Sequence, residues 1–409
     1  MSDHAPYTLS QLQELVRHLH AEAVPWLPSG QGSRLPWGPP VAAGSQVVSG
    51  RRLHGILEHN PGDFTVTVAA GTPLVEVQQH LAQHRQWLSL DPPWGTGLSE
   101  RDPSSPDRQG GGSIGGLVAR GLSGGYRQRY MGLRDQLIGI QLLRSDGVLA
   151  RAGGKVVKNV AGYDLMRLLA GSWGSLGLIT SLTLRTHPLP PQRRALLIQA
   201  PLAELAPLVR WLLSSSLAPE RIDWWSAPLA AAAGHRPEPL LLLSLASISA
   251  ETLLEQINCI EAKTPHHCLS LEPEALEPLL AAGRGCGTEP APEPPAWLLR
   301  LAVPPASLAE LLACPAAQGL AMALAAGSGI GDAWASAADL PRYRVEELRR
   351  HCSALGGYLT VLHQPEPSPG VARLNAWLDA PARPWIEAVK RHFDPSQQLA
   401  RGRLPGVAG

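Results

Sequence analysis

Residues 109–125 read QGGGSIGGLVARGLSGG, with glycine at eight of the seventeen positions. Glycine has no side chain and adopts positive φ angles without steric cost, so such a cluster is typical of a loop that wraps closely around another group. A G-x-G-x-x-G pattern lies within it at Gly110, Gly112 and Gly115. The dinucleotide fingerprint of a Rossmann fold is therefore the first interpretation to weigh.

The sequence before this cluster argues against a Rossmann fold. That fingerprint follows an apolar strand and opens a helix, because the pyrophosphate sits at the helix N-terminus. Residues 99–109 read SERDPSSPDRQ, which is charged and rich in turn formers. Asp135 has the spacing of a ribose-binding acid, but one matching spacing is weak evidence. We therefore expect another way of holding a phosphate or a flat ring.

Length and charge limit the function classes. A chain of 409 residues predicts two or three domains. It carries 35 basic and 34 acidic residues for a net charge of +1, and no basic block indicates a nucleic-acid partner. The five cysteines are scattered and never form C-x-x-C, which favours a reducing compartment and excludes an iron–sulfur cluster held by this chain alone.

The N-terminal sequence indicates no targeting segment. Residues 1–20 lack a long apolar run and include acidic residues, unlike a signal or transit peptide. No stretch approaches the roughly 20 apolar residues of a membrane span. We expect a cytoplasmic protein without direct membrane insertion, or one held peripherally at a membrane by partners.

Hydrophobic periodicity predicts an α+β arrangement in the first half. Helices are expected over 8–21 and 73–87, with strands over 51–58 and 64–70. Residues 132–154 predict two strands joined by an Asp-Gly hairpin.

The rest of the chain alternates strands and helices. Residues 163–172 predict a short helix with Asp164 as N-cap and Gly171 as stop, followed by a strand over 176–190. Alternation beyond residue 190 predicts a layered α/β domain. A strand over 375–380, a helix over 381–393 and a tail are expected to complete the chain.

Four glycine-bearing stretches require a common explanation. They are PSGQGSR (28–34), the opening cluster, AGGKVVKNVAGYD (152–164) and GSWGSLGLIT (171–180). The first follows a predicted strand and offers consecutive backbone N–H groups, which is the geometry of an anion-binding nest. An ordinary turn explains any one stretch, but four in one domain indicate a shared ligand.

This order of motifs resembles the PCMH-type FAD-binding domain of the vanillyl-alcohol oxidase superfamily. The resemblance rests on P-x-G-x-G-S, P-x-D-x-T-V-x-V at 61–68, the prolines at 92 and 93, S-I-G-G, and G-S-x-G-x-L-G at 171–177. Within the superfamily, the chain is similar to the E-type FAD-binding subunit of bacterial glycolate oxidase, also called glycolate dehydrogenase. The stretches that carry this similarity are GLSGGYRQRYMGLRD (121–135), GGKVVKNVAGYDLMRLLAGSWGSLGLIT (153–180) and KRHFDP (390–395).

The resemblance implies an architecture and a flavin site. It implies a PCMH-type FAD-binding domain of two α+β subdomains over 1–190, an α/β layered, ferredoxin-like cap or substrate domain over 191–370, and a segment over 371–409 that returns to the FAD domain. The residues expected to bind FAD are Ser29, Gly30, Gln31, Gly32, Ser33, Pro93, Gly112, Ser113, Ile114, Gly115, Gly116, Gly121, Ser123, Gly124, Gly177 and Ile179. Backbone N–H groups at 29–33 and 112–116 would surround the pyrophosphate without any lysine.

Two departures bear on the cofactor site. The PSGQGSR loop lacks the His, Cys or Tyr to which related enzymes attach flavin, so non-covalent FAD is expected. The tail reads QLARGRLPG where the family has Asn-Pro-Gly-Arg, which leaves the role of Arg403 open.

Oxidation of a 2-hydroxy acid requires a hydride acceptor, a cation for the carboxylate and a base. The flavin takes hydride from the substrate carbon, an arginine pairs with the carboxylate, and a base takes the hydroxyl proton. Lys158, Tyr163, Arg127 and Arg129 lie in motifs expected near the flavin. Surface charge for the arginines, and packing before a helix for Tyr163, are the alternatives.

Metal ligation is weighed and not expected. Glu76, His80 and His84 fall on one face of the helix predicted over 73–87, but a solvated helix face explains them. Catalytic subunits of related dehydrogenases carry a histidine-rich metal motif in the second domain, and AGSGIGDAW at 326–334 has no histidine.

The resemblance thus implies an FAD-binding subunit of a glycolate dehydrogenase complex that oxidises glycolate to glyoxylate. Its expected partners are a catalytic flavoprotein subunit, an iron–sulfur subunit that receives the electrons, and a small 2-hydroxy acid. A stand-alone FAD oxidoreductase of another hydroxy or sugar acid and a flavin-free structural subunit are the alternatives.

Overall fold

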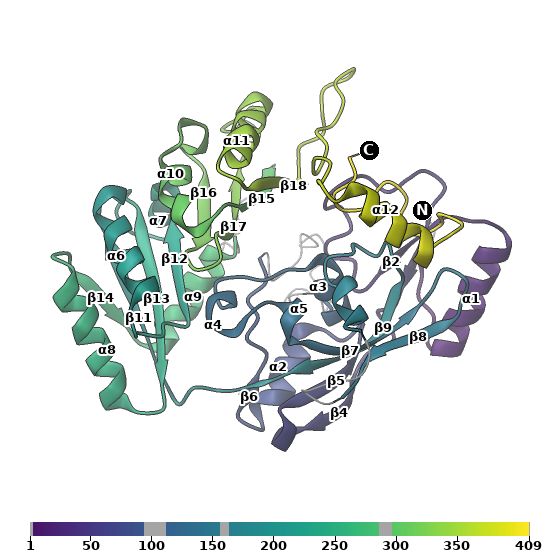
Figure 1. Ribbon diagram of the computed structural model, residues 1–409, viewed down its shortest axis with the longest axis horizontal. Helices are drawn as coiled ribbons and strands as arrows, with labels where there is room; N and C mark the ends of the chain where they lie inside the picture. The colour runs from purple at the N-terminus through teal and green to yellow at the C-terminus, as the bar shows by residue number, and fades with distance from the viewer. Residues whose placement is uncertain (1–2, 94–111, 156–162, 286–296, 409) are drawn as a thin grey trace. The chain divides into compact units, whose positions relative to one another are not determined.

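The computed structural model describes residues 3–93, 112–155, 163–285 and 297–408 (Figure 1). The chain divides into two compact units. The first comprises Met1–Leu122, Gly132–Leu189 and Asn375–Gly409, and the second comprises Ser123–Met131 and Pro190–Leu374. Both combine helices with sheets, which confirms the mixed α+β class. The short stretch Ser123–Met131, expected within the FAD domain, is grouped with the second unit.

The first unit is built on a five-stranded antiparallel sheet in the order β4-β5-β9-β7-β8. The strands are β4 (Ile56–Asn60), β5 (Thr65–Ala69), β7 (Leu137–Leu143), β8 (Leu149–Gly153) and β9 (Leu178–Arg185). The expected Asp-Gly hairpin joins β7 to β8, where Arg144 N–H donates to the Val148 carbonyl and Gly147 has φ +76°. Central strands β7 and β9 are buried along most of their length, as expected for the middle of a sheet.

A smaller parallel sheet carries the glycine loop that follows Ser29. Strands β1 (Asp3–His4), β3 (Gln46–Ser49) and β2 (Trp26–Ser29) pair in that order. Helix α1 (Leu9–Ala21) begins at a capping box of Thr8 and Gln11 and packs its apolar face against Trp26. This packing fixes the start of β2, the strand that leads into the loop.

The C-terminal segment belongs to the first unit and is held by a buried lysine. Lys390 on α12 (Arg383–Phe393) donates to the carbonyls of Ser175 and Leu399 at 2.8 Å and to the Asp394 carboxylate at 2.5 Å. Asp394 is fully buried and accepts from the backbone N–H of Leu399 at 2.8 Å. The KRHFDP stretch therefore joins the tail to the loop that contains Ser175.

The remaining elements of the first unit are short. They are α2 (Leu74–Ala82), α3 (Ile114–Arg120), α5 (Leu133–Gln136), the 3-10 turns Pro61–Asp63 and Leu165–Leu168, and the paired strands β6 (Gln86–Trp87) and β10 (His187–Pro188).

Several expected elements of the first unit differ in extent. The helix expected to reach residue 87 ends at Ala82, because the chain turns through Arg85 at φ +54° into β6. The helix expected over 163–172 is the 3-10 turn, and Asp164 makes no side-chain capping bond there. The strand expected over 375–380 is irregular, since buried Trp377 donates its indole N–H to the Val407 carbonyl.

The second unit is an eight-stranded antiparallel sheet with helices packed on it (Figure 1). The order is β14-β11-β13-β12-β16-β17-β15-β18. Its strands are β11 (Gln192–Gln199), β12 (Arg221–Trp225), β13 (Leu240–Ser247), β14 (Cys268–Leu271), β15 (Trp297–Ala302), β16 (Ala321–Ala325), β17 (Ile330–Ala335) and β18 (Tyr358–His363). Its helices are α4 (Arg127–Tyr130), α6 (Leu202–Ser214), α7 (Ala227–Ala232), α8 (Ala250–Lys263), α9 (Pro273–Gly283), α10 (Leu308–Ala313) and α11 (Arg342–Ala354), with 3-10 turns Pro305–Ser307 and Pro315–Ala317.

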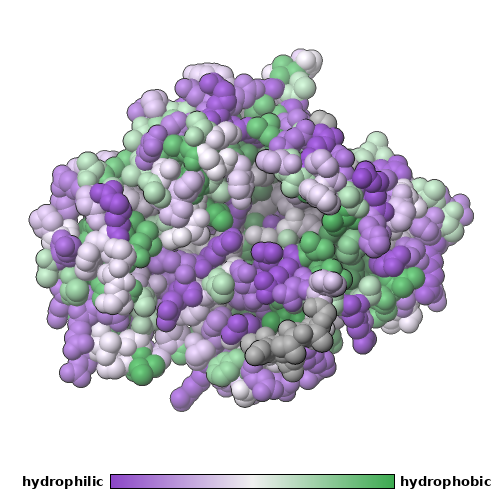
Figure 2. Space-filling view, viewed as in Figure 1, coloured by the Kyte–Doolittle hydropathy of each residue, from purple (hydrophilic) through white to green (hydrophobic). Residues whose placement is uncertain are grey.

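No helix within the described ranges could cross a membrane. Each helix there is too short or too polar to cross a bilayer. The face drawn in Figure 2 mixes hydrophilic and hydrophobic side chains.

Candidate functional site

Glycine-rich loops of the first unit meet around one pocket, which encloses about 730 Å³ of empty space, part of it open to solvent. Ten of the residues expected to bind FAD line it: Ser29, Gly30, Gln31, Gly32, Ser33, Ser113, Gly115, Gly116, Gly177 and Ile179. Pro93, Gly112, Ile114, Gly121, Ser123 and Gly124 do not line this pocket. Arg34, Arg120 and Trp173 do, although the sequence did not single them out.

The loop after β2 turns its carbonyl groups toward the protein. Ser49 Oγ donates to the Gly30 carbonyl at 2.8 Å, and Gln31 Nε2 donates to the Gly71 carbonyl at 2.9 Å. Gly32 adopts φ +85°. The backbone N–H groups of residues 31–33 have no hydrogen-bond acceptor among the described residues. Consecutive N–H groups arranged in this way form a nest that suits an anion.

The first turn of α3 is fixed by the segment that follows β5. Ser113 caps α3 by accepting from Gly116 N–H at 3.3 Å. The N–H groups of Ile114 and Gly115 donate at 2.9 Å to the carbonyls of Thr72 and Ala70. Those two donors therefore stabilise the protein and do not bind a ligand, contrary to the expectation for residues 112–116.

The glycines around the pocket serve two different purposes. A Cβ atom on Gly30 would overlap Ser113 Oγ, and one on Gly115 would crowd Ala70, so both positions allow loops of the protein to approach each other. A Cβ on Gly116 would meet only Ser113 Oγ, at 3.1 Å. Gly116 therefore leaves space on the pocket side rather than against another loop.

Two arginines, Arg34 and Arg120, line the pocket, and a third, Arg403, supports it. Arg120 Nη2 donates to the Arg34 carbonyl at 2.7 Å, and its guanidinium stacks 3.8 Å from the centre of the Trp173 ring. Arg403, 1% exposed, donates through Nη1 to the Leu35 carbonyl at 3.1 Å and through Nη2 to the Trp37 carbonyl. Arg403 thus supports the Arg34–Trp37 turn from behind.

Arg120 and Arg403 lack a counter-charge within the described chain. No carboxylate there lies within ion-pair distance of either guanidinium, and Arg120 Nη1 has no hydrogen-bond partner. Burial, with the neighbouring charges of Arg403 and Arg34, lowers the pKa of Arg120 well below its ordinary value. Burial lowers the pKa of Arg403 to about 10. Buried cations without partners are costly, so the pocket suits a ligand that carries negative charge.

A diphosphate fits this donor set. Phosphate oxygens would accept hydrogen bonds from the nest at 31–33 and from the planar guanidinium of Arg120. The lining residues include two arginines beside the expected backbone donors. Their positions in the sequence could have identified both arginines. Arg34 directly follows P-x-G-x-G-S, and Arg120 is the last residue of the helix that begins at S-I-G-G.

The residues considered for catalysis are dispersed. Arg127 and Arg129 are on α4 in the second unit, and Tyr163 is 87% exposed in the first. Lys158 lies outside the described residues. The structure brings none of these three described residues to the pocket.

A paired network surrounds α4 in the second unit. Tyr130 Oη donates to Glu220 at 2.5 Å, and Arg193 binds both Glu220 oxygens at 2.6 and 3.0 Å. Burial and the Glu220 carboxylate raise the pKa of Tyr130, so its hydroxyl stays protonated. A Cβ on Gly125 would crowd Arg221 and Asp223, which are themselves paired. This network therefore holds α4 on β12. Its charges are paired with one another, whereas Arg120 at the pocket has no carboxylate partner among the described residues.

Comparison with known proteins agrees with a cofactor site in the first unit. Residues 4–99 match the family model described as an FAD binding domain. The chain is 32% identical over 200 residues to glycolate oxidase subunit GlcE of Escherichia coli, covering 48% of this chain and 53% of that one. It is 26% identical over 288 residues to glycolate oxidase subunit GlcD of Bacillus subtilis, covering 70% and 56%. It is 34% identical over 196 residues to D-2-hydroxyglutarate dehydrogenase of Xanthomonas citri, covering 48% and 39%.

The chain therefore spans about half the length of the curated relatives it matches. Among solved structures, alkyldihydroxyacetonephosphate synthase aligns with a TM-score of 0.68 at 15% identity, covering 98% of this chain and 77% of that one. This likeness is one of fold, and together with the family match it confirms the expected FAD-binding fold and FAD as the cofactor.

Proposed function

Because the first unit carries an FAD-binding domain, we propose that this chain is the FAD-binding subunit of a glycolate dehydrogenase complex. In that complex glycolate is oxidised to glyoxylate, and the electrons pass to an iron–sulfur subunit. The second unit is the cap or substrate domain. The observation that carries the flavin assignment is the pocket that the nest at 31–33 shares with Arg120, which has no carboxylate partner among the described residues. The relatives named glycolate oxidase subunits support the substrate class.

Bound FAD supplies an acceptor for the hydride that leaves the α-carbon of a 2-hydroxy acid. The protein's part is to bind and orient that cofactor. The nest at 31–33 and Arg120 hold the pyrophosphate, while Arg403 keeps the Arg34–Trp37 turn in place. Gly116 leaves room for the cofactor along α3.

The cysteines support an iron–sulfur partner. Burial raises the pKa of Cys268 to about 11 and that of Cys352 to about 12, so these thiols stay protonated and are poor cluster ligands. Cys314 is also buried, whereas Cys259 is exposed. Cys286 lies outside the described residues. Electrons that reach the flavin are therefore expected to leave through another subunit.

Flavin release is expected on denaturation. The loop at 28–34 offers no His, Cys or Tyr for attachment, so acid or heat should free FAD from the purified holoprotein. The supernatant would show the flavin absorbance, and mass spectrometry of the chain would show the apo mass. A flavin still attached to a denatured peptide would contradict non-covalent binding. A chain that binds no flavin at all, even after reconstitution with FAD, would instead favour the structural-subunit alternative.

The isolated chain is expected to oxidise glycolate slowly even when saturated with FAD. None of the three described catalytic candidates is among the residues that line the pocket, so a complete substrate site is expected only in the complex. Dye-linked turnover of the FAD-loaded chain should be far below that of the complex reconstituted with its partners. Equal rates would overturn the subunit proposal. Turnover by the isolated chain of another hydroxy or sugar acid, but not glycolate, would support the stand-alone alternative.

A further inference from the structure

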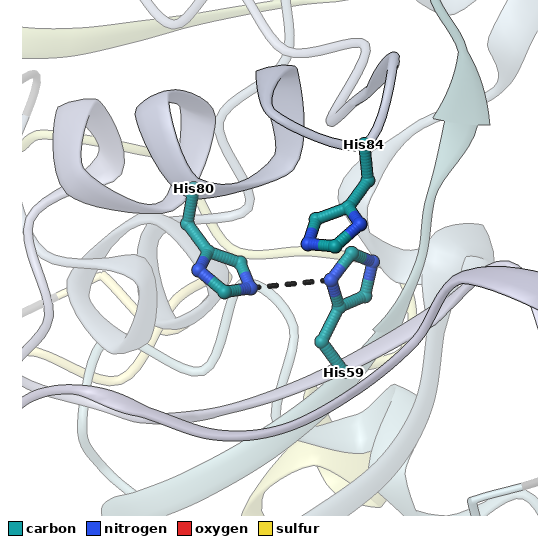
Figure 3. Close-up of side chains that lie close together, drawn as sticks. All are labelled: His59, His80 and His84. Atoms are coloured by element: carbon teal, nitrogen blue, oxygen red, sulfur yellow. Dashed lines mark hydrogen bonds between the residues drawn. The ribbon is translucent and has the colours of Figure 1, made fainter.

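Three histidines of the first unit, none of which lines the pocket, gather at the edge of the five-stranded sheet (Figure 3). His59 lies on β4, His80 lies on α2, and His84 lies in the turn that follows α2. One ring nitrogen from each lies within 4.8 Å of those of the other two. The ring centroids are 4.8 to 5.7 Å apart.

This cluster differs from the constellation that the sequence offered. His84 follows the last residue of α2, Ala82, so the helical spacing from Glu76 ends before it. Glu76 is exposed and is not part of the cluster. The third member is His59, which is distant in sequence and whose ring lies against those of His80 and His84 (Figure 3).

Gln86 fixes the tautomer of His59. The Gln86 side chain donates through Nε2 to the Pro61 carbonyl at 2.7 Å, which assigns its Oε1 as an acceptor. That oxygen accepts from Thr186 Oγ1 at 2.6 Å and lies 3.2 Å from His59 Nε2. His59 therefore carries its proton on Nε2 and leaves the Nδ1 lone pair directed at His80, whose Nε2 is 3.1 Å away.

This is the arrangement that holds a histidine ligand in a metal site. A ligating imidazole commonly donates its other N–H to an oxygen that fixes the ring. Two nitrogens on a tetrahedral zinc ion lie about 3.3 Å apart, given Zn–N bonds of about 2.0–2.1 Å. The His59–His80 separation already matches, and His84 is exposed in a turn where a small ring movement brings it closer. Burial and the other two rings lower the pKa of His80, which favours the neutral ligand form.

We propose that His59, His80 and His84 form a binding site for a divalent transition-metal ion of the zinc class. Three neutral nitrogen ligands with no carboxylate among them favour Zn²⁺, Cu²⁺ or Ni²⁺ over Mg²⁺ or Ca²⁺. The ion replaces the His80–His59 hydrogen bond and fastens α2 to the edge strand β4. Water completes the coordination, because His84 faces solvent.

The test is a titration of the FAD-loaded full chain with Zn²⁺ alone, followed by calorimetry, with Co²⁺ absorption reporting the ligand geometry. One saturable site per chain and the intense visible bands of four-coordinate Co²⁺ are expected. Gln86→Leu, which keeps all three ligands, should weaken binding about 10- to 100-fold. His80→Ala and His59→Ala should weaken it more.

His54→Ala is the matched control, since His54 is exposed in the same unit and outside the cluster. Its affinity for Zn²⁺ should equal that of the unaltered chain. His84→Asn, at an exposed turn, tests the site without risk to the core, and flavin absorbance verifies that each variant is folded. Absence of a saturable site, or equal affinity in His84→Asn and His54→Ala, would overturn the proposal.

Discussion

Replacing Gly116 with valine is expected to abolish FAD retention while the chain stays folded. Gly116 lies in the first turn of α3 and lines the pocket. A Cβ there would meet only Ser113 Oγ, at 3.1 Å, so the protein can accommodate it with a small adjustment. The two further methyl groups of valine extend into space that the cofactor needs. Overpacking of this kind costs roughly 1–3 kcal/mol, which weakens FAD binding by about 10- to 100-fold or more.

Flavin absorbance after gel filtration and circular dichroism of the same sample provide the measurement. Gly116→Ala adds the Cβ without the branch and should retain much of the flavin. Gly62→Val is the control for a valine at an exposed glycine, where a Cβ would meet nothing within 4 Å. If Gly116→Val is folded and keeps full flavin, the pocket assignment is wrong.

The sequence predicts this fold well where the signal is local. The β7–β8 hairpin follows from Asp-Gly between two apolar runs, and α1 follows from its apolar spacing after Thr8. Element ends were less predictable. The end of α2 depends on Arg85 adopting φ +54°, a conformation that propensity does not favour outside glycine, and Trp377 is buried in an irregular segment rather than a strand.

The sequence predicted which loops form the site but not which contacts the residues of those loops make. The P-x-G-x-G-S and S-I-G-G motifs identified two of the loops that line the pocket, because glycine has few reasons to recur in fixed order. The role of each glycine could be assigned only from the structure. A side chain at Gly30 would collide with Ser113, and one at Gly115 would collide with Ala70, so these two glycines allow close packing of the protein and do not make space for a ligand. Likewise, the histidine cluster could not be predicted from the sequence, because His59 lies on a different element from His80 and His84.

Arg120, which lines the pocket, was missed for a related reason. A sequence shows that Arg120 and Arg403 exist, but whether each has a counter-charge depends on the fold. Arg193, Arg221 and Arg300 in the second unit are all paired with carboxylates. Only the three-dimensional structure distinguishes an arginine in a structural ion pair from one that is available to bind an anion.

Replacing Arg120 with leucine is therefore expected to have opposite effects on the holoprotein and the apoprotein. FAD affinity should fall about 10- to 100-fold, because a hydrogen bond to a charged phosphate contributes roughly 1.5–3 kcal/mol. The free energy of unfolding of the apoprotein should be unchanged or higher. Leucine removes a buried charge that has no carboxylate partner among the described residues, and this offsets the lost stacking on Trp173 and the lost bond to the Arg34 carbonyl.

Thermal unfolding with and without FAD separates the two effects. The flavin-free melting temperature should not fall, whereas the increase that FAD produces should shrink, because the stabilisation of the folded state by a ligand grows with its affinity. Arg391→Leu, at an exposed arginine on α12 in the same unit, should change neither quantity. Arg120→Lys keeps the charge but loses the planar fork and the stacking, so its FAD affinity should be intermediate. If Arg120→Leu instead destabilises the apoprotein and leaves FAD affinity intact, Arg120 is a structural residue that stacks on Trp173, and the anion at the pocket must be held by the nest alone.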